Sequence, residues 1–163
     1  NDRTLPINVS PLTVNALLEI ADGGFVLGIR GGSVETGKIA ILPGGHAEYT
    51  IPPIENALET FRAEFREELG YEFDGNVFPI CVMTNKDTKG VNVLYAARTG
   101  LSFPQIEKNW RTAKDSGEHS LLIKASKQDI KQLARTGKIN IRDKEYSTTP
   151  LLKDCFELIS SRF

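Results

Sequence analysis

The sequence of 163 residues lacks most of the features that mark specialised classes of protein. Its two cysteines, Cys81 and Cys155, are too far apart for metal-ligand spacing and too few for a disulfide framework. Such a cysteine content suits a reducing compartment, so we expect a cytoplasmic protein. No apolar run approaches the ~18 residues that a membrane span requires, which argues against a membrane partner. The chain also lacks internal repeats and low-complexity tracts.

A net charge of one sign is also missing. Twenty lysines and arginines against 21 aspartates and glutamates leave a net charge of -1, so no overall field attracts a nucleic acid polymer. Hydrophobic residues make up 40% of the chain and charged residues 25%, which excludes disorder and supplies enough apolar surface for a core. We expect residues 1–163 to form a single domain, because domains typically contain roughly 100–200 residues.

The apolar pattern predicts both strands and helices. Six segments have the composition of strands: 13–20, 24–30, 39–42, 77–84, 90–98 and 121–123. Three segments have helical periodicity: 53–69, 127–135 and 150–161. Asp22-Gly23 predicts a hairpin between the first two strands, whereas residues 100–120 show little periodicity. Since strands and helices do not alternate, we expect an α/β (α+β) fold with a mixed or antiparallel sheet flanked by helices.

The helix predicted over 53–69 carries an unusual group of glutamates. Glu64, Glu67 and Glu68 lie on one flank of its apolar stripe, with Glu68 only about 50° from the centre of that stripe. Three carboxylates within five residues repel one another, and the helix dipole disfavours negative charge in this half of the helix. Two interpretations remain open: the cluster is a solvated face, or it binds a hard divalent cation such as Mg²⁺ or Mn²⁺.

Motifs around this helix favour the second interpretation. The turn Pro43-Gly44-Gly45-His46 precedes Glu55, and the helix ends in Glu64-Phe65-Arg66-Glu67-Glu68-Leu69-Gly70-Tyr71. Together they resemble the signature of the Nudix hydrolases: Gly, five residues, Glu, seven residues, then Arg-Glu-hydrophobic-any-Glu-Glu-any-Gly-hydrophobic. The resemblance covers about residues 12–135. It implies a Nudix-like α/β/α sandwich with a mixed sheet between helices.

The sequence departs from this signature at two places. Nine residues separate Gly45 from Glu55 instead of five, an insertion around 49–53 that lengthens the loop before the helix. Ala63 stands where the family has an arginine that helps to hold the neighbouring catalytic glutamate in position, and Arg62 and Arg66 project to the other flank. Loss of such a residue costs roughly 10–100-fold in metal affinity or activity. We therefore expect reduced activity that Ala63→Arg raises.

The resemblance implies a divalent-metal-dependent pyrophosphohydrolase that cleaves the diphosphate linkage of a small nucleoside-diphosphate derivative, with Mg²⁺ or Mn²⁺ as cofactor. The implied metal ligands are Glu64, Glu67, Glu68 and the Gly45 carbonyl, and the three glutamates are also the implied catalytic residues. Two rival hypotheses are a catalytically weak or inactive Nudix-fold nucleotide-binding or sensor module, and a structural protein with a solvated glutamate face. Many relatives form homodimers, and the sequence excludes neither a homodimer nor a monomer.

Other site residues follow from position. Glu118 is the candidate general base because the family often places one in a loop before a late strand, and Asp115 and His119 stand behind it; the alternative is an ordinary polar loop. Arg30 ends a strand near the same turn, so it is either a phosphate ligand or a surface arginine. His46 either binds substrate or fixes the turn. The aromatic residues of 100–120, Phe103 and Trp110, are candidates for base stacking, with core packing as the alternative.

Overall fold

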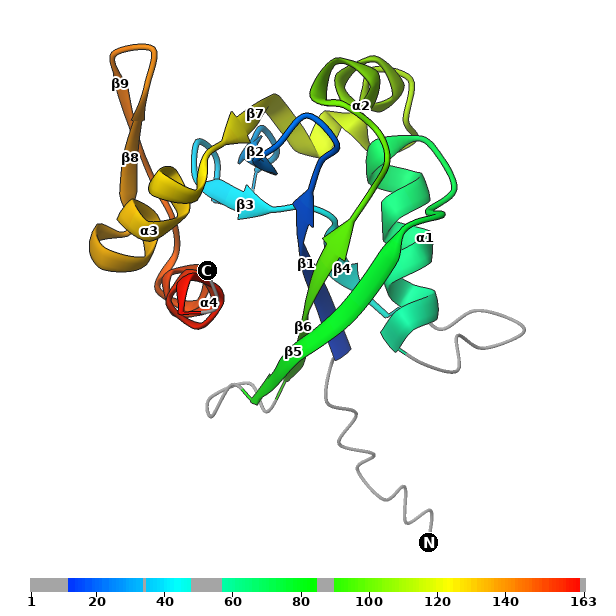
Figure 1. The fold of residues 1–163 in the computed structure, drawn as a ribbon, viewed down its shortest axis with the longest axis horizontal. Coiled ribbons are helices and arrows are strands. Elements are labelled where there is room, and N and C mark those ends of the chain that lie inside the picture. Colours follow the sequence, from blue (N-terminus) through cyan, green and yellow to red (C-terminus); the bar gives the residue numbers. More distant parts are fainter. Residues whose placement is uncertain (1–11, 34, 48–56, 85–89, 162–163) are drawn as a thin grey trace, which may run out of the picture.

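The structure is a computed structural model that describes residues 12–33, 35–47, 57–84 and 90–161 (Figure 1). Glu55, the inserted residues 49–53 and the predicted start of the helix at Pro52-Pro53 lie outside the described residues. No helix in the described ranges is both long and apolar enough to cross a membrane.

The central sheet is mixed, with the order β3-β2-β1-β6-β5, and two further strands pair outside this path. β1 and β6 pair in parallel, whereas the other pairs are antiparallel. β4 pairs with β1, and β7 pairs with β2. The strands of this sheet are β1 (Leu12–Glu19), β2 (Phe25–Arg30), β3 (Ile39–Ile41), β4 (Gly44–His46), β5 (Asn76–Thr84), β6 (Val91–Arg98) and β7 (His119–Ala125).

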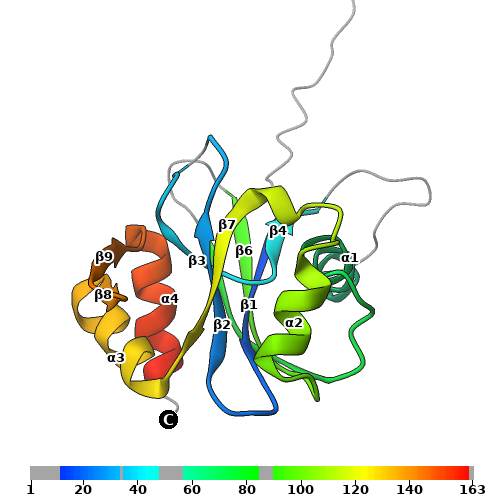
Figure 2. The ribbon, with the colours of Figure 1, turned by 90° about the horizontal axis from the view of Figure 1, so that it is seen from above.

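Helices cover both faces of this sheet (Figure 2). One face carries α1 (Ala57–Leu69) and α2 (Phe103–Trp110). The other carries α3 (Lys127–Thr136), α4 (Pro150–Ser160) and a small hairpin of β8 (Lys138–Ile141) and β9 (Lys144–Ser147). A hydrophobic cluster lies under each layer of helices. The predicted arrangement of a mixed sheet between helices is confirmed.

The apolar stripe of α1 fixes the orientation of the glutamates. Phe61, Phe65 and Leu69 are fully buried, as the helical wheel predicts. The rings of Phe61 and Phe65 lie 5.0 and 4.8 Å from the Phe73 ring, and both contacts are close to edge-on. Since this face is fixed against the sheet, the flank with Glu64 turns toward β4.

Three parts of the fold have no counterpart in the sequence prediction. α2 lies in the stretch with little periodicity, although its capping box of Ser102 and Gln105 is a local signal for a helix start. β4 is only three residues long and begins with two glycines. The β8-β9 hairpin turns at Arg142-Asp143, both at positive φ, without the usual Asn-Gly or Asp-Gly signal.

Candidate active site

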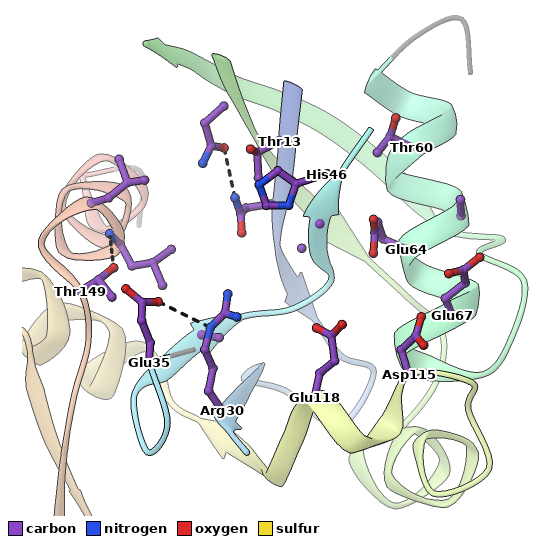
Figure 3. Close-up of a pocket in the computed structure, with 18 of the residues that line it drawn as sticks. Thr13, Arg30, Glu35, His46, Thr60, Glu64, Glu67, Asp115, Glu118 and Thr149 are labelled. Atoms are coloured by element: carbon purple, nitrogen blue, oxygen red, sulfur yellow. Dashed lines mark hydrogen bonds and ion pairs between the residues drawn. The ribbon is translucent and has the colours of Figure 1, made fainter. Parts of the chain in front are cut away.

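A cavity of about 1110 Å³ opens between α1, β4, the short 3₁₀ turn η1 (Ser116–Glu118) and the start of α4 (Figure 3). Its lining is strongly acidic. Seven carboxylate side chains and two arginines are among the lining residues: Glu35, Glu59, Glu64, Glu67, Asp115, Glu118, Asp154, Arg30 and Arg66. A pocket with this imbalance attracts cations, and an arginine within it can bind an anionic group of a larger ligand.

Gly45 and Glu64 meet at the wall of the cavity. β4 pairs with β1 so that Gly45 lies opposite Val14, and the Glu64 side chain points toward β4 from α1 (Figure 3). A Cβ atom at position 45 would lie 2.0 Å from the carboxyl carbon of Glu64. A side chain at this position would therefore displace the Glu64 carboxylate, and the structure brings together two of the residues that the resemblance implies as metal ligands.

Glu68 is the third implied ligand on α1, and it lies beneath the cavity rather than on its lining. Its side chain is almost completely buried, and the residue is only 3% exposed. The Gly44 N–H donates a hydrogen bond to Glu68 Oε2 at 2.9 Å. Burial raises the pKa of Glu68 well above its usual value, and the nearby Glu64 and Glu118 raise it further. A solvated face therefore does not describe this member of the cluster.

Glu67 lines the cavity and is held from the loop before η1. Lys114 Nζ donates to Glu67 Oε2 at 2.8 Å, and the Asp115 N–H donates to the Glu67 backbone carbonyl at 2.9 Å. The hydrogen bond from Lys114 is the main reason why the pKa of Glu67 is lowered. Sequence analysis did not assign Lys114 to the site, although it lies four residues before the candidate general base Glu118.

Glu118 and Arg30 both line the cavity, from η1 and from the end of β2. Glu118 is exposed and points into the cavity (Figure 3). Arg30 Nε lies 3.7 Å from Glu35 Oε2, a contact that is too long for a hydrogen bond but close enough for an ion pair. The exposed His46 also lines the cavity, on β4.

Three other candidates lie away from the lining. His119 is buried, and its ring packs where a Cβ on Gly28 would lie 2.3 Å from its Cδ2. Burial and the nearby Arg30 lower the pKa of His119 to about 4, so this imidazole is neutral at physiological pH. Phe103 and Trp110 are partly buried and pack against the core on the α1 and α2 side. This arrangement matches the packing alternative for the two aromatic residues.

Sequence analysis missed two further parts of the lining. Thr13, Asn15 and Asn92 line the cavity from β1 and β6, and Asn15 Nδ2 donates to Asn92 Oδ1 at 3.1 Å. The available signal was a pair of asparagines within apolar strand segments. The opposite wall is formed by the first turn of α4, residues 149–152, whose approach to the cavity leaves no local sign in the sequence.

The donor chemistry of the cavity fits a hard divalent cation. Carboxylate and carbonyl oxygens are the ligands that Mg²⁺ prefers, and Glu64 lies directly against the Gly45 backbone. A cation would also offset the repulsion that raises the pKa of Glu68. In the described ranges, however, no group of three or more His, Cys, Asp or Glu side chains is arranged to hold a metal ion. The described carboxylates thus share one cavity without forming a closed set of ligands.

Comparisons with known proteins place this site on a known fold. No family model and no curated protein sequence matches the chain. The MutT protein of Methanosarcina mazei Go1 is 20% identical, with a TM-score of 0.62 and 94% of each chain covered. A MutT Nudix hydrolase of Burkholderia pseudomallei is 17% identical, with a TM-score of 0.62 and 93% of this chain and 98% of that chain covered.

A third similar structure was crystallised with a ligand. The Nudix domain of Shewanella oneidensis NrtR, crystallised with ADP ribose, is 16% identical, with a TM-score of 0.62 and 94% of this chain and 88% of that chain covered. The sheet, the helix layers and these similarities define the class as a mixed α/β sandwich of the MutT type. The chain has the Nudix fold, as the resemblance in sequence implies.

Proposed function

We propose that the chain is a divalent-metal-dependent hydrolase that cleaves the diphosphate linkage of a nucleoside-diphosphate derivative. The observation that carries this proposal is the convergence of Glu64, Glu67 and Glu118 with Arg30 in one cavity of the Nudix fold. ADP ribose, the ligand of the Shewanella structure, is itself a nucleoside-diphosphate derivative, which supports this substrate class.

In the proposed reaction, the residues of α1 and β4 hold the cation. Glu64, Glu67, Glu68 and the Gly45 carbonyl would be its ligands, and a bound divalent ion neutralises charge on the phosphate oxygens. Arg30 binds a further phosphate oxygen through its guanidinium group and so orients the diphosphate.

Glu118 acts on the attacking water in this proposal. A carboxylate that is already bound to a metal is a weak base, so a residue outside the ligand set is better suited to take the proton. Glu118 is exposed at the cavity and lies on η1, apart from the helix that carries the ligands. The P–O–P linkage breaks as water adds to one phosphorus, the proton passes to Glu118, and two phosphate-bearing products form.

A second candidate function is supported by Ala63. This residue lines the cavity with a methyl group where the Nudix signature has a long cation. A Nudix-fold module that binds a nucleotide without turnover would tolerate this change.

One assay separates these candidates. The protein is incubated with Mg²⁺ or Mn²⁺ and a panel of nucleoside-diphosphate derivatives, and the products are analysed by ³¹P NMR and chromatography. We expect hydrolysis of at least one compound, and a loss of about 100-fold in kcat for Glu118→Gln. Glu145→Gln is the matched control because Glu145 pairs with Lys138 on the β8-β9 hairpin, outside the cavity lining. Binding of a compound without formation of products supports the nucleotide-binding module. If the protein neither binds nor hydrolyses any compound, both candidate functions are refuted.

A further inference from the structure

Residue 63 and Glu67 share one face of α1 at the cavity. They are one helical turn apart, and both line the cavity. At this spacing a long basic side chain would reach the carboxylate four residues later. Alanine has no such group, so Glu67 needs another partner if its carboxylate is to keep one orientation.

Lys114 is that partner in the structure. Its Nζ lies 2.8 Å from Glu67 Oε2, which is the length of a short charge-assisted hydrogen bond. The next residue, Asp115, ties the same loop to the end of α1 through its N–H and the Glu67 carbonyl, at 2.9 Å. Backbone and side chain thus bind the loop to the same glutamate.

Lys114 contacts Glu67 from outside the cavity. Glu67 and Asp115 line the cavity, whereas Lys114 is not among the described residues of the lining and its side chain is 70% exposed. The lysine therefore holds one carboxylate oxygen from the solvent side. A cation in the cavity would approach Glu67 from the cavity side, where the Asp115 side chain also contacts it.

The arginines of α1 are placed differently. Arg66 Nη1 donates to Glu72 Oε1 at 2.9 Å, outside the glutamate cluster. Arg62 is exposed, one position away from the face that Ala63 and Glu67 share. The charge of Arg66 also lowers the pKa of Glu67, but the lysine that donates a hydrogen bond to Glu67 comes from the loop before η1.

We propose that Lys114 is a positioning residue that holds the Glu67 carboxylate for the divalent cation, and that this contact is why residue 63 can be alanine. The inference rests on the proposed function. It also changes the expectation for Ala63→Arg. When Lys114 is present, an arginine at position 63 adds little to metal binding or activity, whereas when Lys114 is removed, the arginine replaces it as the partner of Glu67.

The test compares five variants of the full chain: Lys114→Met, Lys114→Arg, Ala63→Arg, the double variant Ala63→Arg/Lys114→Met, and Lys108→Met. Two quantities are measured: the Mn²⁺ dissociation constant without substrate, by electron paramagnetic resonance, and kcat and KM with a nucleoside-diphosphate derivative that the wild type cleaves. Lys108→Met is the matched control, because Lys108 is an exposed lysine of α2 outside the cavity lining.

We expect Lys114→Met to weaken Mn²⁺ binding by about 10-fold and to lower kcat more than it changes KM. Lys114→Arg, Ala63→Arg and the double variant all keep a basic partner for Glu67, so each should bind Mn²⁺ within about 3-fold of the wild type. A change of about 3-fold corresponds to under 1 kcal/mol. Lys108→Met should change neither quantity. Rescue in the double variant, where the arginine lies on α1, would show that Lys114 supplies a positive charge beside the Glu67 carboxylate. It would exclude a role limited to the fold of the loop.

Two results would overturn the inference while leaving the proposed function intact. One is an active wild type whose Lys114→Met variant binds Mn²⁺ and turns over normally. The other is a defect in Lys114→Met that Ala63→Arg does not relieve, with thermal unfolding used to check that both variants fold. A wild type that neither hydrolyses the panel nor binds Mn²⁺ would instead refute the proposed function, and the inference with it.

Discussion

Glu68 places an acidic group where burial opposes its charge. The residue is only 3% exposed, and both Glu64 and Glu118 repel its ionised form. Its pKa in the folded chain lies well above the usual value of 4.5, which applies to the unfolded chain. Between these two values the folded state binds more protons than the unfolded state, so the free energy of unfolding falls as pH rises through this range.

We therefore predict that Glu68→Gln raises the free energy of unfolding at pH 8 in the presence of EDTA. The amide oxygen can still accept the hydrogen bond from Gly44, and the variant no longer buries a charge. Each unit of pKa difference that is removed corresponds to about 1.4 kcal/mol. Thermal unfolding between pH 5 and 8 measures the effect, with Glu157→Gln on α4 as the control. An equally steep pH dependence in wild type and variant would contradict the prediction.

The placement of single residues could be predicted only where it depends on one element. Helical geometry alone sets Glu64 and Glu67 on the flank that faces the cavity. The contact between Lys114 and Glu67 joins residues 47 positions apart, and that between Asn15 and Asn92 joins residues 77 apart. Such pairs follow from how loops and strands pack in three dimensions, which no periodicity in the sequence records.

At the scale of elements, local signals decided what could be predicted. The hairpin of β1 and β2 and the helix α3 have clear turn or capping residues, and both are confirmed. The short strand β4, which follows Pro43, could not be predicted from the sequence. Its glycines have no strand preference, and its pairing with β1 is non-local. Yet this pairing is what places Gly45 beside Glu64.

The N-terminus of α3 provides a test of such a local signal. Asp129 N–H donates to Ser126 Oγ at 3.2 Å, and Ser126 N–H donates to Asp129 Oδ2 at 2.7 Å, which is a capping box. We predict that Ser126→Ala lowers the free energy of unfolding by about 1 kcal/mol. Urea denaturation measures this loss, and Lys131→Ala, an exposed position in the same helix, is the control.

Because α3 covers the face of the sheet opposite α1, the same variant should leave Mn²⁺ binding unchanged (Figure 2). A loss of Mn²⁺ affinity in Ser126→Ala would show that the two helix layers are coupled through the sheet. A stability equal to that of the wild type would show instead that solvent replaces the cap at no cost.

Charge is distributed unevenly over the whole molecule. The full chain has a net charge of -1, yet seven carboxylates and two arginines are among the described residues that line the cavity. Outside these nine residues, the chain has 18 basic and 14 acidic residues. This separation creates a local negative field without making the protein as a whole acidic, and a field of this kind concentrates cations at one place.

We predict that saturating Mg²⁺ raises the melting temperature of the whole chain. A ligand that binds only the folded state at 100 times its dissociation constant adds about 2.7 kcal/mol to the free energy of unfolding. For a chain of this size, each kcal/mol corresponds to roughly 2–4 °C, so a rise of roughly 5–10 °C is expected, reversed by EDTA.

Sodium chloride at the same ionic strength separates specific binding from screening of the carboxylates, because monovalent ions screen charge without requiring converging ligands. Glu64→Gln removes the carboxylate that lies against Gly45, and should therefore abolish most of the Mg²⁺ effect while keeping the sodium effect. If sodium chloride and Mg²⁺ raise the melting temperature equally, or if Glu64→Gln responds to Mg²⁺ as the wild type does, the cavity screens charge diffusely and does not coordinate an ion through α1 and β4.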